Sequence, residues 1–167
     1  SDEEVYVQSG DIVKGGQQDR TLAYDLLVPP RSGRLPLAAF CVEQGRWSQR
    51  GGESATDFSL SGAMLSLKSL KLAAKERRSQ SEVWDKVAES QEKLAYSLPV
   101  AKATPAAGGA GGGALSAPLP PANVRAAQSA SSLQLTLENK EVRETSEQYV
   151  KALLPTIEGK SDAIGYA

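Results

Sequence analysis

The clearest hydrophobic pattern in the chain is Leu35–Trp47, where the apolar run LPLAAFCV ends abruptly in the polar string EQGRW. A short, nearly continuous apolar run is typical of a strand that is buried on both faces. Pro36 has no N–H for a sheet ladder, so pairing is expected to begin after it. The segment therefore predicts a central strand that carries polar and aromatic side chains at its end.

Other extended segments flank this run. Val5–Val13 is interrupted by turn residues in its middle, and Thr21–Val28 is followed directly by two prolines. Phe58–Leu72 alternates only weakly, and it fits either a strand followed by a helix or one long strand. A last strand is expected to start at Asp162–Ala167, where the sequence stops, so that further sequence or a neighbouring chain would complete the sheet.

Two segments show the apolar period of amphipathic helices. The first is expected to begin near Ser79, which has capping-box spacing to Glu82, and to end before Pro99. The second is expected to run from an N-cap at Asn139 to about Leu154. The predicted inward stripes are Val83, Trp84, Val87, Leu94 and Leu98 in the first helix, and Val142, Tyr149, Val150, Leu153 and Leu154 in the second.

Between these helices lies a low-complexity segment that contains AAGGAGGGA and APLPPA. Such a composition buries too little apolar surface to offset the entropy lost on ordering. The expected organisation is therefore N-terminal strands and the first helix over residues 1–98, a flexible Ala/Gly/Pro-rich linker over 99–130, and a helix plus terminal strand over 131–167 that complete the same domain. The predicted fold class is α+β, with a mixed, mainly antiparallel sheet, two amphipathic helices packed on it, and an incomplete C-terminal strand.

Composition excludes several classes of function. The formal net charge of −1 provides no field for steering nucleic acid, and no apolar segment is long enough to span a bilayer. The opening SDEEVY has neither an initiator Met nor a hydrophobic signal region, which slightly favours an extracytoplasmic mature protein over a cytoplasmic one.

The chain contains no histidine, which removes the commonest general base and the usual zinc ligand. Cys41 is the only cysteine, so an internal disulfide and a cysteine metal cluster are both excluded. No spacing of carboxylates indicates paired acid–base chemistry. We therefore expect no catalytic residue, no cofactor and no metal site, and an enzyme is the least favoured class.

The candidate ligand-binding residues lie at the end of the organising strand. Arg46 could pair with a phosphate or carboxylate, Trp47 could stack on a base or sugar, and Glu43 and Gln44 could bond ribose hydroxyls. The alternative is a structural corner in which Glu43 pairs with Arg46, a glycine makes the turn, and Trp47 fills the core.

A second polar cluster, Gln17 to Arg20, follows two glycines, and Gln18 and Arg20 are its candidate ligand contacts. This loop would face the same edge if the two strands are neighbours. GGQQDR lacks the spacing of a dinucleotide-binding or P-loop motif, so a phosphate-cradling loop has only weak support.

The chain resembles a known family on these residues. GDIVKGGQQDRTLAYDLLVP followed by LAAFCVEQGRW is similar to the opening of the ARG and Rhodanese-Phosphatase-superfamily-associated protein domain family, in which CVEQGRW is the most recognisable string. Similar blocks follow in order at residues 79–94 and 131–167. The resemblance implies an α+β domain whose association is with ADP-ribose and NAD metabolism, and it supplies no catalytic residues.

Two functional hypotheses follow. The first is a non-catalytic binding domain for a nucleotide or ADP-ribose-like ligand. The alternative is an exported structural or assembly subunit whose sheet is completed by a neighbouring chain. Both are compatible with a protein partner or self-association, and neither involves nucleic acid.

Overall fold

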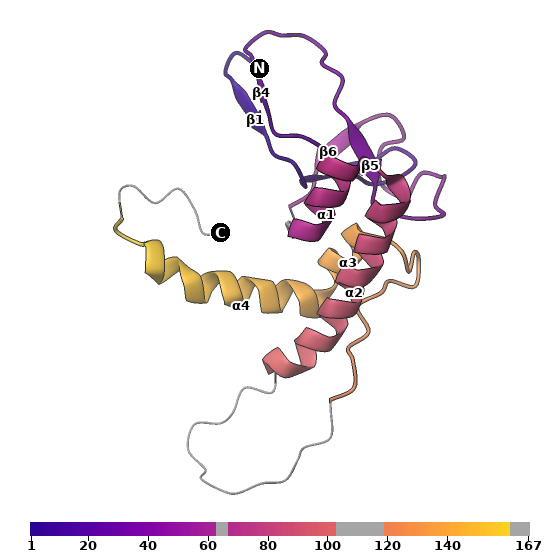
Figure 1. The fold of residues 1–167 in the computed structure, drawn as a ribbon, viewed down its shortest axis with the longest axis vertical. Coiled ribbons are helices and arrows are strands. Elements are labelled where there is room, and N and C mark those ends of the chain that lie inside the picture. The colour runs from indigo at the N-terminus through magenta and orange to yellow at the C-terminus, as the bar shows by residue number, and fades with distance from the viewer. Residues whose placement is uncertain (63–66, 103–118, 161–167) are drawn as a thin grey trace, which may run out of the picture.

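The computed structural model describes residues 1–62, 67–102 and 119–160, and the strand expected at Asp162–Ala167 lies outside them. Strands lie at one end of the molecule and helices at the other (Figure 1). The elements in chain order are β1 (Val5–Val7), β2 (Ile12–Gly15), β3 (Arg20–Leu22), β4 (Leu26–Val28), β5 (Ala39–Cys41), β6 (Phe58–Leu60), α1 (Lys68–Leu72), the π-helical turn η1 (Ala73–Arg77), α2 (Gln80–Lys102), α3 (Leu133–Glu138) and α4 (Lys140–Ile157).

The described strands form two separate sheets. The larger has the order β5-β3-β2-β6, and the smaller is the ribbon β1-β4. Every pairing is antiparallel, with Ile12 opposite Thr21 and Arg20 opposite Cys41. The predicted α+β class with a mainly antiparallel sheet is confirmed.

The predicted central strand is instead a short edge strand. Of the apolar run only Ala39–Cys41 forms the strand β5, and Leu35 and Leu37 remain 42% and 44% exposed. The free edge of β5 is covered by a helix residue: the Cys41 N–H donates to Gln80 Oε1 at 2.9 Å, and Gln80 Nε2 donates to the Cys41 carbonyl at 2.8 Å. The side-chain amide thereby takes the place that a further strand would have filled.

Two predicted strands are each divided. Thr21–Val28 becomes β3 in the larger sheet and β4 in the ribbon, because the chain changes direction at Ala23–Asp25. Asp25 fixes this bend, since its Oδ1 accepts the Ser9 N–H at 2.9 Å. Val5–Val13 is divided in the same way between β1 and β2. The ambiguous segment Phe58–Leu72 is a strand followed by a helix.

The predicted helix starts are confirmed by their caps. Ser79 Oγ accepts the Glu82 N–H at 3.4 Å at the start of α2. Asn139 Oδ1 accepts the N–H groups of Glu141 and Val142 at 2.9 and 3.4 Å at the start of α4. Both helices continue past the prolines expected to stop them, α2 to Lys102 and α4 to Ile157.

One hydrophobic core joins the larger sheet to the helices. It consists of Ile12, Val42, Leu70, Ala73, Ala74, Val83, Val87, Leu98, Val124, Leu133, Leu137 and Val142. Val124 comes from the region predicted as a linker, and the neighbouring Ala122 N–H donates to the Ala95 carbonyl of α2 at 2.7 Å. Residues 119–130 therefore pack against the helices, whereas residues 103–118 lie outside the described structure.

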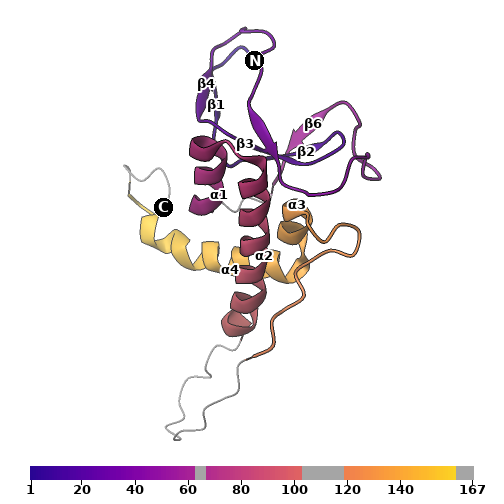
Figure 2. The ribbon, with the colours of Figure 1, turned by 45° about the vertical axis from the view of Figure 1, so that its right-hand side comes forward.

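The predicted inward stripe of α4 is wrong beyond its first turn. Val142 is buried at 2% exposure, but Tyr149, Val150 and Leu154 are 63%, 53% and 52% exposed. In both ribbon views the first turns of α4 lie beside α2 and α3, and the rest of the helix runs past the body (Figure 2). The stripe is apolar, as expected, but no described part of the chain covers its second half.

Candidate functional site

The fold brings the two predicted polar segments together. Arg20 begins β3 directly opposite Cys41 of β5, and the Val42 N–H extends this pairing by donating to the Asp19 carbonyl at 3.0 Å. Gln18 and Asp19 in the turn before β3 therefore lie next to the segment that follows β5. Because β3 and β5 are neighbours in this register, the Gln17–Arg20 loop and the Glu43–Trp47 segment lie at the same end of the two strands, as expected.

Five side chains from these segments form a chain of ion pairs, which we call the corner cluster: Glu43, Arg46, Asp19, Arg50 and Glu53. Arg46 Nε donates to Glu43 Oε2 at 2.5 Å, and Arg46 Nη2 lies 3.6 Å from Asp19 Oδ1. Arg50 Nη2 lies 2.7 Å from Asp19 Oδ2 and 2.8 Å from Glu53 Oε1. The side chains of Asp19 and Glu43 are fully buried, so the chain of ion pairs ties the loop after β5 to the β2–β3 turn.

The corner cluster contains three carboxylates and two guanidiniums, so its formal charge is negative. Burial raises the pKa of Asp19, and the ion pair with Arg50 offsets part of that rise. Burial lowers the pKa of Arg50, but its bonds to Glu53 and Asp19 outweigh this effect and raise it. Each guanidinium is already shared between carboxylates, which makes the cluster a scaffold rather than an open anion site.

Several buried polar atoms around the cluster have no hydrogen-bond partner within the described chain. Both amide atoms of Gln18, which is 1% exposed, are among them, as are Glu43 Oε1 and Arg50 Nη1. Buried polar groups in proteins are nearly always hydrogen-bonded. These atoms are therefore where an enclosed water molecule would add most to the stability of the corner.

Two of the predicted ligand residues face solvent. The Trp47 side chain is 65% exposed, so it does not fill the core as the structural alternative required. Gln44 is also exposed, and its backbone carbonyl accepts a hydrogen bond from Ser131 Oγ at 2.6 Å. Arg46 Nη1 donates to the Ser48 carbonyl at 2.6 Å, which fixes the backbone at the residue that follows Trp47. The corner thus presents Gln44 and Trp47 on a rigid base.

The model of one protein family, the ARG and Rhodanese-Phosphatase-superfamily-associated Protein domain (ARPP-1), matches residues 1–167 of this chain. The chain belongs to the ARPP-1 family. No curated protein and no solved structure matches it significantly. The family description associates the domain with ARG and the rhodanese-phosphatase superfamily and specifies no ligand or reaction.

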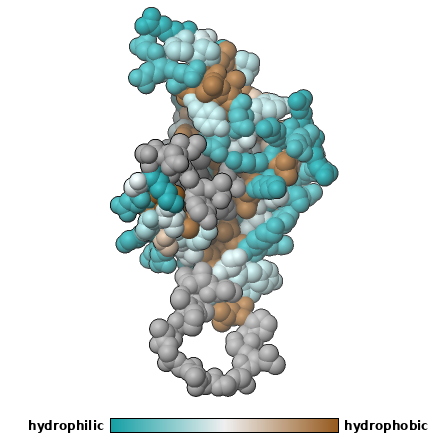
Figure 3. All heavy atoms as spheres, turned by 60° about the vertical axis from the view of Figure 1, so that its left-hand side comes forward, coloured by the Kyte–Doolittle hydropathy of each residue, from teal (hydrophilic) through white to brown (hydrophobic). Residues whose placement is uncertain are grey.

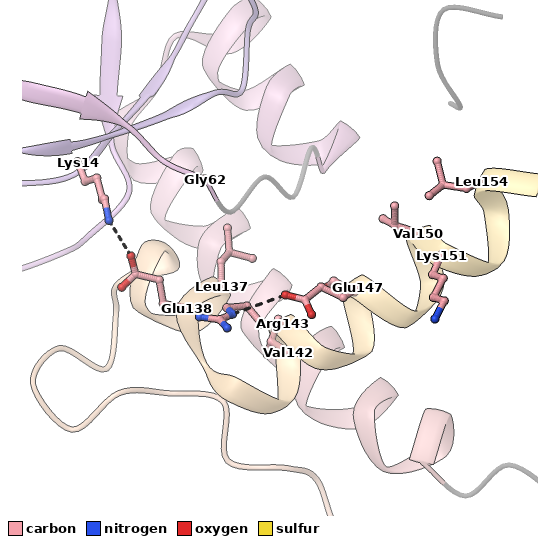
Figure 4. Close-up of a pocket in the computed structure, with 11 residues that line it drawn as sticks. Lys14, Gly62, Leu137, Glu138, Val142, Arg143, Glu147, Val150, Lys151 and Leu154 are labelled. Atoms are coloured by element: carbon pink, nitrogen blue, oxygen red, sulfur yellow. Dashed lines mark hydrogen bonds and ion pairs between the residues drawn. The ribbon is translucent and has the colours of Figure 1, made fainter. Parts of the chain in front are cut away.

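This ARPP-1 domain has a concave region, away from the corner, that the sequence did not reveal. It is a groove of about 640 Å³ between α4 and the end of α3, with Lys14 of β2 on its other side. Lys14 Nζ lies 3.0 Å from Glu138 Oε1 (Figure 4). Gln134 Nε2 donates to the same oxygen at 2.7 Å. Burial raises the pKa of Glu138, but these two contacts outweigh it, so its pKa is lowered overall.

Sequence reasoning missed Arg50 and Glu53, the two members of the corner cluster that follow Trp47. Their spacing of three residues was the available signal, because such a pair can close a turn. Among the described residues, no group of acidic or cysteine side chains is arranged to hold a metal ion. In the same part of the chain no helix has the length and apolar character needed to cross a membrane.

Proposed function

We propose that this chain is a non-catalytic binding domain in which Trp47 and Gln44 contact a nucleotide-like ligand. The observation that carries the proposal is the difference in exposure between two adjacent residues. Trp47 is 65% exposed, whereas the Arg46 side chain is 11% exposed and pairs with Glu43. An exposed aromatic ring on a fixed backbone is suited to stacking on a planar base. The corner cluster supplies the rigid support for it.

The chemistry of the corner restricts the ligand. A base would stack on Trp47, and the exposed amide of Gln44 could bond a ribose hydroxyl. A phosphate is not favoured at Arg46, because that guanidinium already pairs with two carboxylates. Arg20 is half-buried and makes no ion pair with a described residue, so it is the better phosphate contact of the two.

Titration of the protein with adenosine, AMP, NAD and ADP-ribose tests this proposal, with calorimetry as the readout. Replacing Trp47 by Ala should weaken binding by about 1–3 kcal/mol, the usual contribution of one base–aromatic stack, and Trp47→Phe should lose less. Tyr96→Ala is a matched control, because Tyr96 is an equally exposed aromatic residue (63%) on α2. The ligand should be recovered unchanged after incubation.

Absence of binding across this panel would refute the proposal. Equal losses in Trp47→Ala and Tyr96→Ala would also refute it, because they would show that the indole has no specific role.

A second candidate function, an assembly subunit, is favoured by the open edge of β6. Phe58 and Leu60 are 49% and 61% exposed, and β6 ends the order of the larger sheet. The Ser61 N–H donates to the Ile12 carbonyl at 2.8 Å, so in an antiparallel ladder the Leu60 N–H points away from β2. A strand of a neighbouring chain could pair there.

Leu60→Pro tests the assembly function, because it removes an outward N–H without removing a ladder bond of β2. If β6 pairs with another chain, the variant should lose that complex in sedimentation, whereas Leu60→Ala should retain it. A complex that survives Leu60→Pro unchanged would exclude the β6 edge as the contact.

A further inference from the structure

The second half of α4 displays an apolar stripe that the described chain leaves uncovered. At 3.6 residues per turn, Ser146, Tyr149, Val150, Leu153 and Ile157 fall on one side of the helix. Tyr149 and Val150 are exposed, and Leu153 and Ile157 are only partly buried. Apolar surface is also exposed elsewhere on the molecule: on the side seen in Figure 3, brown patches lie between teal hydrophilic ones.

The stripe continues into the groove beside α3. Leu137 and Val142 form the apolar floor of that groove, and Arg143, Glu147 and Val150 of α4 line it further along (Figure 4). On α4 the groove is lined from Val142 as far as Leu154, so the exposed ridge Tyr149–Ile157 borders the hollow and shares Val150 with its wall. Ridge and hollow lie on the same helix, so two copies of the helix could fill each other's hollow if they ran antiparallel.

The spacing of the stripe fits such a pairing. Counted outward from the midpoint between Tyr149 and Val150, Ser146 and Leu153 are equally distant, and so are Val142 and Ile157. In an antiparallel pair with its two-fold axis at this midpoint, Tyr149 of one copy meets Val150 of the other. Ile157 of each copy then lies over the Val142 end of its partner, where the groove is.

The charges on the flank of the stripe are complementary in the same register. Glu147 faces Lys151 of the second copy, and Lys140 faces Glu158. All four side chains are exposed. Each contact occurs twice by symmetry, so the pairing gives four opposite-charge contacts. Among the described residues of one copy, both groups have only long ion pairs: Glu147 Oε1 lies 3.9 Å from Arg143 Nε, and Lys140 Nζ lies 3.7 Å from Glu144 Oε1.

We propose that two copies of this chain associate through an antiparallel α4–α4 contact, in which the Tyr149–Ile157 ridge of each copy enters the groove beside α3 of the other. The occupant of the groove is thus a second copy. This inference is independent of the ligand proposal, and it uses α4 rather than the β6 edge on which the assembly proposal rests.

Analytical ultracentrifugation of the full chain over the micromolar to millimolar range tests the contact. The wild type should approach twice 17.6 kDa as concentration rises. Val150→Asp should remain at 17.6 kDa over the same range, because it places a charge at the two-fold axis. Ala152→Asp is the matched control: Ala152 is exposed on the other side of the same turn, so this variant should dimerise like the wild type.

A mixing experiment tests the register. Glu147→Lys alone sets lysine against lysine in the dimer, and Lys151→Glu alone sets glutamate against glutamate. Each should weaken dimerisation roughly tenfold, because two attractive pairs become repulsive. An equimolar mixture of the two variants should form a heterodimer with wild-type affinity, since every contact across the interface is then of opposite charge.

A wild type that stays monomeric over the whole concentration range would overturn the proposal. So would a Val150→Asp variant that still dimerises, or a mixture of the two charge variants that associates no better than either alone. A dimer that resists these α4 changes but is lost in Leu60→Pro would assign association to the β6 edge instead. Far-UV circular dichroism of each variant checks that α4 remains helical.

Discussion

Arg50→Ala gives the sharpest test of the corner cluster, because Arg50 joins two carboxylates of different burial. Its removal leaves Asp19, which is fully buried, with only Arg46 Nη2 at 3.6 Å and the Gly15 N–H at 3.4 Å. Removing one partner of a buried ion pair costs about 3–5 kcal/mol, since the remaining charge stays uncompensated. The Arg50 side chain is 16% exposed, so water can partly replace it. We therefore expect a loss of about 2–4 kcal/mol.

The measurement is urea unfolding at neutral pH, followed by circular dichroism. A loss of that size is a large fraction of the roughly 5–15 kcal/mol by which a domain is stable, and it should lower the midpoint without changing the slope. Arg31→Ala is the matched control, because Arg31 Nε lies 2.8 Å from Asp2 Oδ1 with both side chains 82% exposed. Removal of this surface pair should cost at most about 1 kcal/mol.

The pH dependence gives the same test a second readout. Burial already raises the pKa of Asp19, and Arg50 is the main group that lowers it. Without Arg50 the pKa should rise further in the folded state but stay near its usual value in the unfolded state. The folded protein then binds its proton more readily, so the destabilisation should be largest at neutral pH and shrink as pH falls through the raised folded-state pKa. Equal losses in Arg50→Ala and Arg31→Ala, or a loss independent of pH, would refute the electrostatic account.

Three further outcomes are expected. Gln80→Ala should cost about 1–3 kcal/mol in urea unfolding, because it leaves the Cys41 N–H and carbonyl without the Gln80 amide; a loss below about 0.5 kcal/mol would contradict this role. Gln91→Ala should cost about 2–4 kcal/mol, since the buried Gln91 amide donates to Thr136 Oγ1 at 2.9 Å; Gln91→Leu, of similar volume, should not restore it. Glu89, whose pKa is lowered to about 2 by its lysine neighbours, chiefly Lys86, should titrate near that value in NMR, with its contribution to stability lost as pH falls below about 4.5; Lys86→Ala should raise that midpoint.

The helix starts were predictable because the signals that set them are local. Asn139 and Ser79 satisfy N–H groups within the next three residues, so their sequence positions suffice to place the caps. Their ends were less predictable, because a proline only biases the residue before it away from helical angles: Pro99 lies inside α2 and Pro155 inside α4. Amphipathic spacing in α4 predicted an inward stripe, but Tyr149, Val150 and Leu154 are exposed, because spacing alone does not show which part of the chain packs against a helix face.

The place of β5 in the sheet could not be read from its sequence. An apolar run is equally consistent with burial between two strands and with burial between one strand and a helix side chain. The amide of Gln80 decides this, and it lies 39 residues further along the chain. The pairing of Glu43 with Arg46 was one of the two alternatives for the corner, because the residues are close in sequence. Their link to Asp19 depends on strand register, which local sequence does not specify.

The Gln80 amide also gives the larger sheet a direction of growth. Gln80 covers the edge at β5, so a strand from another chain can join the larger sheet only next to β6. An addition between two identical chains at that margin uses up the open side of both, so it yields a pair and then stops. A sheet with two open edges could instead grow into a fibril by adding strands on both sides. Gln80, in the first turn of α2, prevents this growth because it covers one of the two edges.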